Sequence, residues 1–125
     1  MIFQSSMTKD NSKLESLSLI GKRITSIVSG ISLLRRMSNL KELNLSGNRI
    51  EEVGILNELK GLTSLTLNSN RITDVSSLNL PILTILSLDR NRLKSIAGFR
   101  GVKKLEELSL SSNQITVVSM SDIGF

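Results

Sequence analysis

Residue types that commonly carry catalysis are scarce in this 125-residue chain, which has no histidine and no cysteine. The usual catalytic triads, imidazole general bases and zinc sites therefore cannot be assembled. No glycine pattern for phosphate or dinucleotide binding occurs. The acidic pairs Glu51-Glu52 and Glu106-Glu107 are sequence neighbours, which point to opposite faces of a strand. The sequence predicts no catalytic residue, no metal site, no cofactor and no enzyme activity.

Arginines recur at regular intervals and could hold anions. They form a basic stripe of Arg23, Arg49, Arg71 and Arg92. Guanidinium groups one repeat apart could bind carboxylates or phosphates bidentately. We favour another interpretation, in which the arginine stems cover apolar residues beneath them. Three acidic residues nearby in the sequence, Glu51, Glu52 and Asp74, would then neutralise part of the charge.

Asparagines precede three of these arginines and could serve backbone groups inside the protein. The series is Asn48, Asn70, Asn91 and Asn113. A carboxamide donates and accepts, so it can pair with N–H and C=O groups where the chain leaves a strand. Stacked, these residues would form a hydrogen-bonded ladder, and truncating one would leave partners unpaired at a cost of about 1–3 kcal/mol each. Lys22 occupies the first such position, and its ammonium is predicted to reach solvent.

Both series belong to a longer pattern, Leu-x-x-Leu-x-Leu-x-x-Asn-x-Ile, which occurs five times with conservative changes. The copies begin at Leu14, Leu40, Leu62, Leu83 and Leu105. The copies thus start 26, 22, 21 and 22 residues apart. Self-similarity at a period of about 20–50 residues indicates a solenoid of stacked coils. Leucines that alternate with polar residues indicate one strand per coil with one buried face. The remaining residues suffice for the crossover that parallel strands require.

The segments that return behind the strands differ between the copies. Val53, Leu56 and Leu59 recur every three residues, which is typical of 3-10 winding. The longer first copy favours a short α-helical turn that includes residues 34–37. Pro81 favours an extended or irregular arm in the third copy.

The five copies in register resemble the leucine-rich-repeat proteins over residues 14–118. Repeats of 21–22 residues with such arms are similar to the phosphatase-regulator-like class of that family. The resemblance implies an α/β-type solenoid: a right-handed coil with a parallel β-sheet on its concave face and 3-10, short helical or extended arms on its convex face. Residues 1–13 would form an N-terminal segment or cap, and residues 119–125 a short C-terminal tail.

The resemblance also makes the concave sheet the default recognition surface. The solvent-facing strand positions are mostly small and polar: Glu42, Asn44, Ser64, Thr66, Asn68, Ile85, Ser87, Asp89, Glu107 and Ser109. They lack the Trp and Tyr side chains that dominate typical hot spots. We interpret Ile85 as a tolerated single exposed aliphatic residue, with an anchor for a partner as the alternative.

Charge and composition limit the classes of partner and the cellular compartments that fit this chain. Sixteen Lys and Arg against eleven Asp and Glu give a net charge of +5, which admits acidic proteins or nucleic acid. The chain has no Tyr or Trp to stack on bases, so nucleic acid ranks second. The lack of cysteine, of a signal-peptide pattern and of a long apolar run predicts an intracellular, cytoplasmic protein outside the membrane, with nucleus and cilium as alternatives.

Together these patterns predict a non-enzymatic scaffold or adaptor that binds another protein through the concave sheet and the adjacent loop edge. The resemblance suggests a phosphatase catalytic subunit or a cytoskeletal, axonemal motor chain as the class of partner. The alternative function is a basic surface module that associates with RNA or ribonucleoprotein. Two further hypotheses stay open: homodimerisation through a terminal coil, and membership of the chain in a larger protein.

Overall fold

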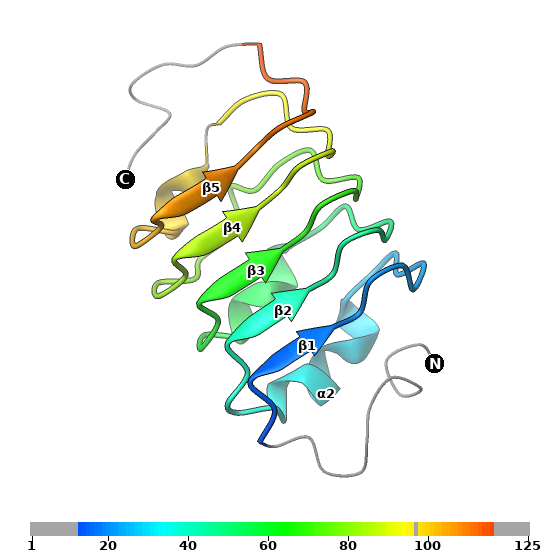
Figure 1. Ribbon diagram of the computed structural model, residues 1–125, viewed down its shortest axis with the longest axis vertical. Helices are drawn as coiled ribbons and strands as arrows, with labels where there is room; N and C mark the ends of the chain where they lie inside the picture. Colours follow the sequence, from blue (N-terminus) through cyan, green and yellow to red (C-terminus); the bar gives the residue numbers. More distant parts are fainter. Residues whose placement is uncertain (1–12, 97, 117–125) are drawn as a thin grey trace.

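Five short strands, one from each repeat, form a single parallel sheet in the computed structural model, which describes residues 13–96 and 98–116 (Figure 1). The strands are β1 (Ser16–Ser18), β2 (Glu42–Asn44), β3 (Ser64–Thr66), β4 (Ile85–Ser87) and β5 (Glu107–Ser109). They lie in sequence order, and every neighbouring pair is parallel. In Figure 1 the chain runs rightward along the strands in front, returns through the fainter arms behind and climbs by one strand per turn. The predicted right-handed leucine-rich-repeat coil is therefore confirmed.

Buried leucines fix the register of the sheet. Leu43, Leu65 and Leu86 stand opposite one another in neighbouring strands and are at most 2% exposed. A slip of one residue would turn these side chains to solvent, so their burial selects one pairing. The strand residues on either side face outward, as predicted, and we call this outward surface, with the residues just beyond the strands, the sheet face. Its first two rows are Ser16, Glu42, Ser64, Ile85, Glu107 and Ser18, Asn44, Thr66, Ser87, Ser109.

The arms behind the sheet follow the predicted mixture of conformations. The described helical segments are η1 (Val28–Gly30), α2 (Ile31–Arg35), η2 (Gly54–Glu58) and η3 (Phe99–Gly101). The 3-10 helix η2 confirms the predicted winding of the second arm, and Val53, Leu56 and Leu59 are all buried there. The helical turn of the first arm starts three residues before the predicted stretch and overlaps it. The third arm has only turns and irregular backbone around Pro81, as expected.

A side-chain amide fastens the non-helical third arm to the second arm. The Asn57 Nδ2 group donates to the Ser77 carbonyl at 2.7 Å, and the Asn57 Oδ1 atom accepts from the Asn79 N–H at 2.7 Å. Lys60 Nζ also donates to the Asn79 carbonyl at 3.1 Å. Asn57 thus supplies the hydrogen bonds that a helix would make internally. Asn57 was not predicted as a structural residue because only Asn79 of the third repeat shares its type at the equivalent position.

Each asparagine at the strand-to-turn corner joins two coils. The Oδ1 atom of Asn48 accepts from the backbone N–H groups of Lys22 and Ile24 in the preceding coil, both at 2.9 Å. Its Nδ2 group donates to Leu19 O at 3.0 Å and to Leu45 O, in its own coil, at 2.8 Å. The amides therefore connect through the backbone and not directly with one another.

The same arrangement repeats at the next three coils. The Oδ1 atoms of Asn70, Asn91 and Asn113 accept from backbone N–H groups of the preceding coil at 3.0–3.1 Å. Each Nδ2 group donates to one carbonyl of the preceding coil and to its own coil. We call these four residues the asparagine ladder. The first coil has Lys22 at this position, and this side chain is exposed.

The residue before each of these corner positions has a left-handed backbone conformation. Gly21 and Gly47 supply it in the first two coils, with φ values of 65° and 70°. Ser69, Arg90 and Ser112 adopt φ values of 56–57° in the other three, where a side chain makes this conformation costly. In three of the five coils, the geometry of the corner therefore overrides the preference of a non-glycine residue for negative φ.

Loss of one ladder amide should destabilise the whole coil. Asn70→Ala leaves the buried Ile50 N–H and the carbonyls of Leu45 and Leu67 without this partner. We expect the free energy of unfolding to fall by about 2–4 kcal/mol in urea titrations. Asn57→Ala, which removes an amide of the outer arms, should cost only about 1 kcal/mol. Equal losses for the two variants would contradict the special role of the ladder.

Close packing of the arms makes a second prediction about stability. A Cβ atom on Gly101 would lie 1.8 Å from the Leu78 carbonyl oxygen, so the backbone of one arm must shift in Gly101→Ala. A Cβ atom on Gly54 would meet only the Ser77 side chain, with the Oγ atom at 3.3 Å and the Cβ atom at 3.5 Å. We expect a loss of about 2–4 kcal/mol for Gly101→Ala and of less than about 1 kcal/mol for Gly54→Ala. Thermal unfolding of both variants measures the difference, and a Gly101→Ala variant as stable as Gly54→Ala would exclude the close contact.

Candidate binding surface

The ten residues predicted to bind a partner lie together on the sheet face. Eight are strand residues of β2 to β5, and Asn68 and Asp89 are the second residues after β3 and β4. Glu42, Ile85 and Glu107 are exposed, and the other seven are half-buried. Parallel pairing without slip is what aligns them in rows. The structure therefore presents one continuous surface, on which hydrogen bonding divides the residues into two groups.

Over β3, β4 and β5 the polar side chains bond to one another across the coils. The Asn68 Oδ1 atom accepts from the Ser87 hydroxyl at 2.6 Å and from the Asp89 N–H at 2.8 Å. One coil further, the Asp89 Oδ1 atom accepts from the Ser109 hydroxyl at 2.5 Å and from the Ser111 N–H at 2.9 Å. We call this region the closed half of the sheet face, because Asn68 and Asp89 already accept hydrogen bonds from the next coil.

These hydrogen bonds also stabilise the charged form of Asp89. The bond from the Ser109 hydroxyl is the main cause that holds the pKa of Asp89 below its usual value. Donors of Ser111 and the positive charge of Arg90 lower this pKa further, while burial opposes the shift. Asp89 is therefore an ionised acceptor within the closed half.

Over β1, β2 and β3 the sheet face contains a shallow hollow of about 190 Å³. Its lining consists of Ser16, Leu17, Ser18, Glu42, Leu43, Asn44, Ser64 and Thr66. We call this region the open half. The Asn44 Oδ1 atom accepts from the Ser46 N–H at 3.0 Å, which leaves the Nδ2 group of Asn44 available. Within residues 13–96 and 98–116, the Glu42 carboxylate and the hydroxyls of this lining form no hydrogen bond or ion pair.

The residue beyond β1 explains why this half stays open. Asn68 and Asp89 occupy the second position after their strands, from which each accepts a hydrogen bond from a hydroxyl of the next coil. The corresponding residue of the first coil is Ile20, which is 52% exposed and offers no acceptor. Ser46 occupies the position in the second coil, and its Oγ atom accepts only from the Asn68 N–H, at 3.2 Å. The side chains opposite them therefore keep free hydrogen-bonding groups.

The basic stripe lies outside the sheet face, in the turns that follow the strands. All four arginines are exposed. In the part of the chain that the structure describes, ion pairs join Arg35 to Glu58 and Lys41 to Glu15, and none includes a stripe residue. The predicted neutralisation by nearby carboxylates therefore does not take the form of ion pairs. Asp74 instead accepts from the Ser76 hydroxyl at 2.7 Å, which lowers the pKa of Asp74.

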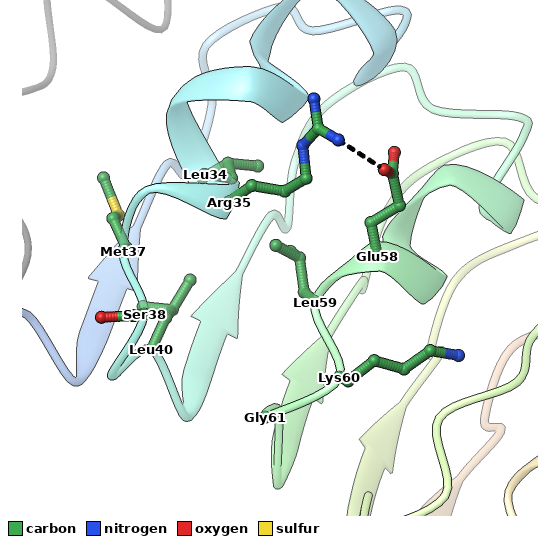
Figure 2. A pocket seen from close by; sticks show the side chains of 9 residues that line it. All are labelled: Leu34, Arg35, Met37, Ser38, Leu40, Glu58, Leu59, Lys60 and Gly61. Atoms are coloured by element: carbon green, nitrogen blue, oxygen red, sulfur yellow. Dashed lines mark hydrogen bonds and ion pairs between the residues drawn. The ribbon is translucent and has the colours of Figure 1, made fainter.

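A smaller hollow of about 90 Å³ lies between the end of α2 and the end of η2 (Figure 2). Leu34, Met37 and Leu59 contribute apolar side chains to it, and the ion pair of Arg35 with Glu58 spans its rim at 2.9 Å. Both members of the pair are substantially exposed, so the pair contributes little to stability. Its size admits no more than a single small group, and we assign it no binding role.

Metal and membrane chemistry find no support in the described residues. Within the described ranges, no three His, Cys, Asp or Glu side chains are grouped as a metal ion requires. None of the helices described there is both long and apolar enough to cross a membrane. The compartment predicted from the sequence stays a prediction.

The lowered pKa of Asp89 predicts a pH-dependent contribution to stability. The folded-state pKa lies below the value of 3.8 for the free side chain, so ionised Asp89 stabilises the fold above about pH 3.8. This contribution is lost as the pH falls through the folded pKa. We expect Asp89→Asn to be less stable than the parent chain at pH 7, and the difference to shrink below about pH 3.8. Denaturant titrations between pH 7 and pH 3 measure it, and a difference that stays constant would contradict the assignment.

Sequence comparisons identify the repeats. One family model, described as a leucine rich repeat, matches residues 60–115, and a second, described as two copies of leucine rich repeats, matches residues 38–80. A search among curated proteins finds no match.

Solved structures with the same coil include two internalins of Listeria monocytogenes. The crystal structure of the internalin inlF has a TM-score of 0.65 and 22% identity, and the match covers 98% of this chain and 43% of that chain. The internalin C2 structure has a TM-score of 0.56 and 22% identity, with 86% and 53% covered. The present chain thus spans about half the length of these proteins, and the likeness concerns the fold. The family matches show leucine-rich repeats over residues 38–115, and the five coils in register form one solenoid of that fold.

Proposed function

We propose that the chain is a non-enzymatic protein-binding module that holds a partner protein on its sheet face, with the open half as the main contact. Leucine-rich-repeat proteins as a class generally mediate protein–protein interactions. The observation that carries the proposal for this chain is the division of the sheet face. Free hydrogen-bonding groups gather at the hollow over β1 to β3, whereas Asn68, Ser87, Asp89 and Ser109 are already paired with one another across the coils.

Free groups bind a partner at lower cost than paired ones. A partner that bonded to the Ser87 hydroxyl through its proton would first have to displace the bond to Asn68. The Asn44 Nδ2 group can donate to a partner without loss of an internal bond, and so can the Thr66 hydroxyl. The net gain is therefore larger in the open half.

Rigidity of the frame adds to this advantage. Leu43 and Leu65 lie directly beneath the hollow and are at most 2% exposed, so the strands that carry the free groups are held by the core. Binding then requires little ordering of the module, and more of the contact energy remains as affinity. Glu42 is the only charged residue of the lining, which favours a lysine or arginine side chain of the partner at this point.

The finer class of the partner is part of the proposal. A phosphatase-regulatory or a cytoskeletal, axonemal role draws support from the 21–22-residue repeats and from the 3-10 arms η2 and η3. The alternative, a module associated with RNA or ribonucleoprotein, draws support only from the basic stripe. The chain has no Tyr or Trp with which to stack on bases. A protein partner is therefore the function we propose.

Paired arginine substitutions test the location of the contact. The immobilised chain is used to capture partners from native extract, which are identified by mass spectrometry, and affinities are then measured with the purified partner. We expect Asn44→Arg/Thr66→Arg, in the open half, to weaken binding at least tenfold, since it fills the hollow and adds charge. Ser87→Arg/Ser109→Arg adds the same charge to the closed half and should change affinity by less than about threefold.

Two outcomes would contradict this assignment. Loss of binding only in the Ser87/Ser109 variant would move the contact to the closed half. Unchanged binding in both variants would remove the contact from the sheet face altogether. Thermal unfolding of each variant establishes that the substitutions leave the coil intact.

A further inference from the structure

We propose that the basic stripe of Arg23, Arg49, Arg71 and Arg92 is a second docking surface, which holds an extended acidic segment of a protein. The stripe lies in the turns that follow the arrowheads of the strands in Figure 1, outside the sheet face. The proposal therefore stands on observations that are separate from the open half and its partner.

Backbone hydrogen bonds hold the stripe residues one coil apart. The backbone N–H of Arg49 donates to the Ile24 carbonyl at 2.8 Å, and that of Arg71 donates to the Ile50 carbonyl at 2.9 Å. Arg92 repeats this bond with the Ile72 carbonyl at 2.9 Å. Parallel strands are spaced by about 4.8 Å, so four stripe residues cover about 14 Å along the coil. An extended segment of about five residues, at roughly 3.3 Å per residue, has the same length.

The guanidinium groups are available for an external anion. All four side chains are exposed, and none forms an ion pair or a side-chain hydrogen bond with the part of the chain that the structure describes. Glu51 and Glu52 follow closely after Arg49, yet neither carboxylate comes within ion-pair distance of the stripe. A guanidinium fork binds a carboxylate through two parallel hydrogen bonds, which suits aspartate and glutamate side chains.

Two features favour an acidic protein segment over nucleic acid. Phe99 is buried, and the chain has no Tyr or Trp, so an aromatic platform for bases is missing from the described surface. Phosphate sites often use backbone N–H groups as well as side chains. At Arg49, Arg71 and Arg92 these N–H groups already bond to the preceding coil. The stripe therefore offers side-chain forks alone, the arrangement that carboxylates require.

A labelled acidic peptide tests the assignment directly. The full chain is titrated into a fluorescein-labelled octaglutamate peptide at low salt, with fluorescence anisotropy as the readout and octaglutamine as the uncharged probe. We expect Arg49→Ser/Arg71→Ser/Arg92→Ser to weaken binding about tenfold, which corresponds to the loss of three exposed ion pairs. Arg36→Ser/Lys103→Ser/Lys104→Ser also removes three exposed positive charges, and lowers the net charge equally from +5 to +2. This control should retain the affinity within about twofold.

Removal of nearby negative charge should act in the opposite direction. We expect Glu51→Gln/Glu52→Gln to tighten binding of octaglutamate a few-fold, because two carboxylates beside the stripe then no longer repel the peptide. The stripe substitutions should weaken octaglutamate binding by the same factor when Asn44→Arg/Thr66→Arg is also present in the open half. Failure of one proposal is then separate from failure of the other.

Three results would overturn the proposal. The first is a lack of binding of octaglutamate by the parent chain at low salt. The second is an equal loss in the stripe variant and in the charge-matched control, since net charge alone would then explain the attraction. The third is tighter binding of an eight-nucleotide oligothymidine than of octaglutamate, lost in the stripe variant, which would assign the stripe to nucleic acid.

Discussion

The dependence of each coil on its neighbour for backbone hydrogen bonds is the constraint on which the rest of the structure depends. Where a strand ends and the chain turns, N–H and C=O groups are left inside the protein, where an unpaired group is costly. The amide of Asn48 reaches back to serve Lys22 and Ile24 of the first coil, and the later asparagines do the same. This explains why a lysine is tolerated at position 22, since the coil that carries it is served from the next one. Stability is therefore a property of adjacent pairs of coils.

The same constraint decides what the surface can do. Because the ladder holds the coils in one register, a polar side chain meets the same neighbour position in the next coil every time. Whether a bond forms then depends on which residues occupy the two positions. An acceptor such as Asn68 or Asp89 followed by a serine closes the pair, whereas Ile20 cannot, and the open half results. Two positions, Ile20 in the first coil and Ser46 in the second, thus leave binding capacity at one end of the sheet.

The framework could be predicted from the sequence because it is written five times at nearly constant spacing. Strand positions, the register of the rows, the buried leucines and the 3-10 arms all follow from this repetition. Pairings between variable positions had no such signal: the Asn57 clamp between two arms and the Asn68–Ser87 bond depend on which residues meet across two coils. The neutralisation expected of Glu51 failed as an ion pair because proximity in a turn does not fix side-chain direction. The residues at variable positions determine the binding surface, and which of them pair across the coils can be seen only in the structure.

Negative and positive side chains lie on different surfaces of the solenoid. Glu42, Asp89 and Glu107 lie on the sheet face, whereas the arginines of the basic stripe lie in the turns beyond the strand ends. A partner that approached both surfaces would meet negative charge on one side and positive charge on the other, which selects one orientation and penalises the reverse. The asparagine ladder holds both the sheet face and the basic stripe, so the distance between these two surfaces is fixed. A partner with a basic contact residue and an acidic segment would order the second contact at little further cost once the first had formed.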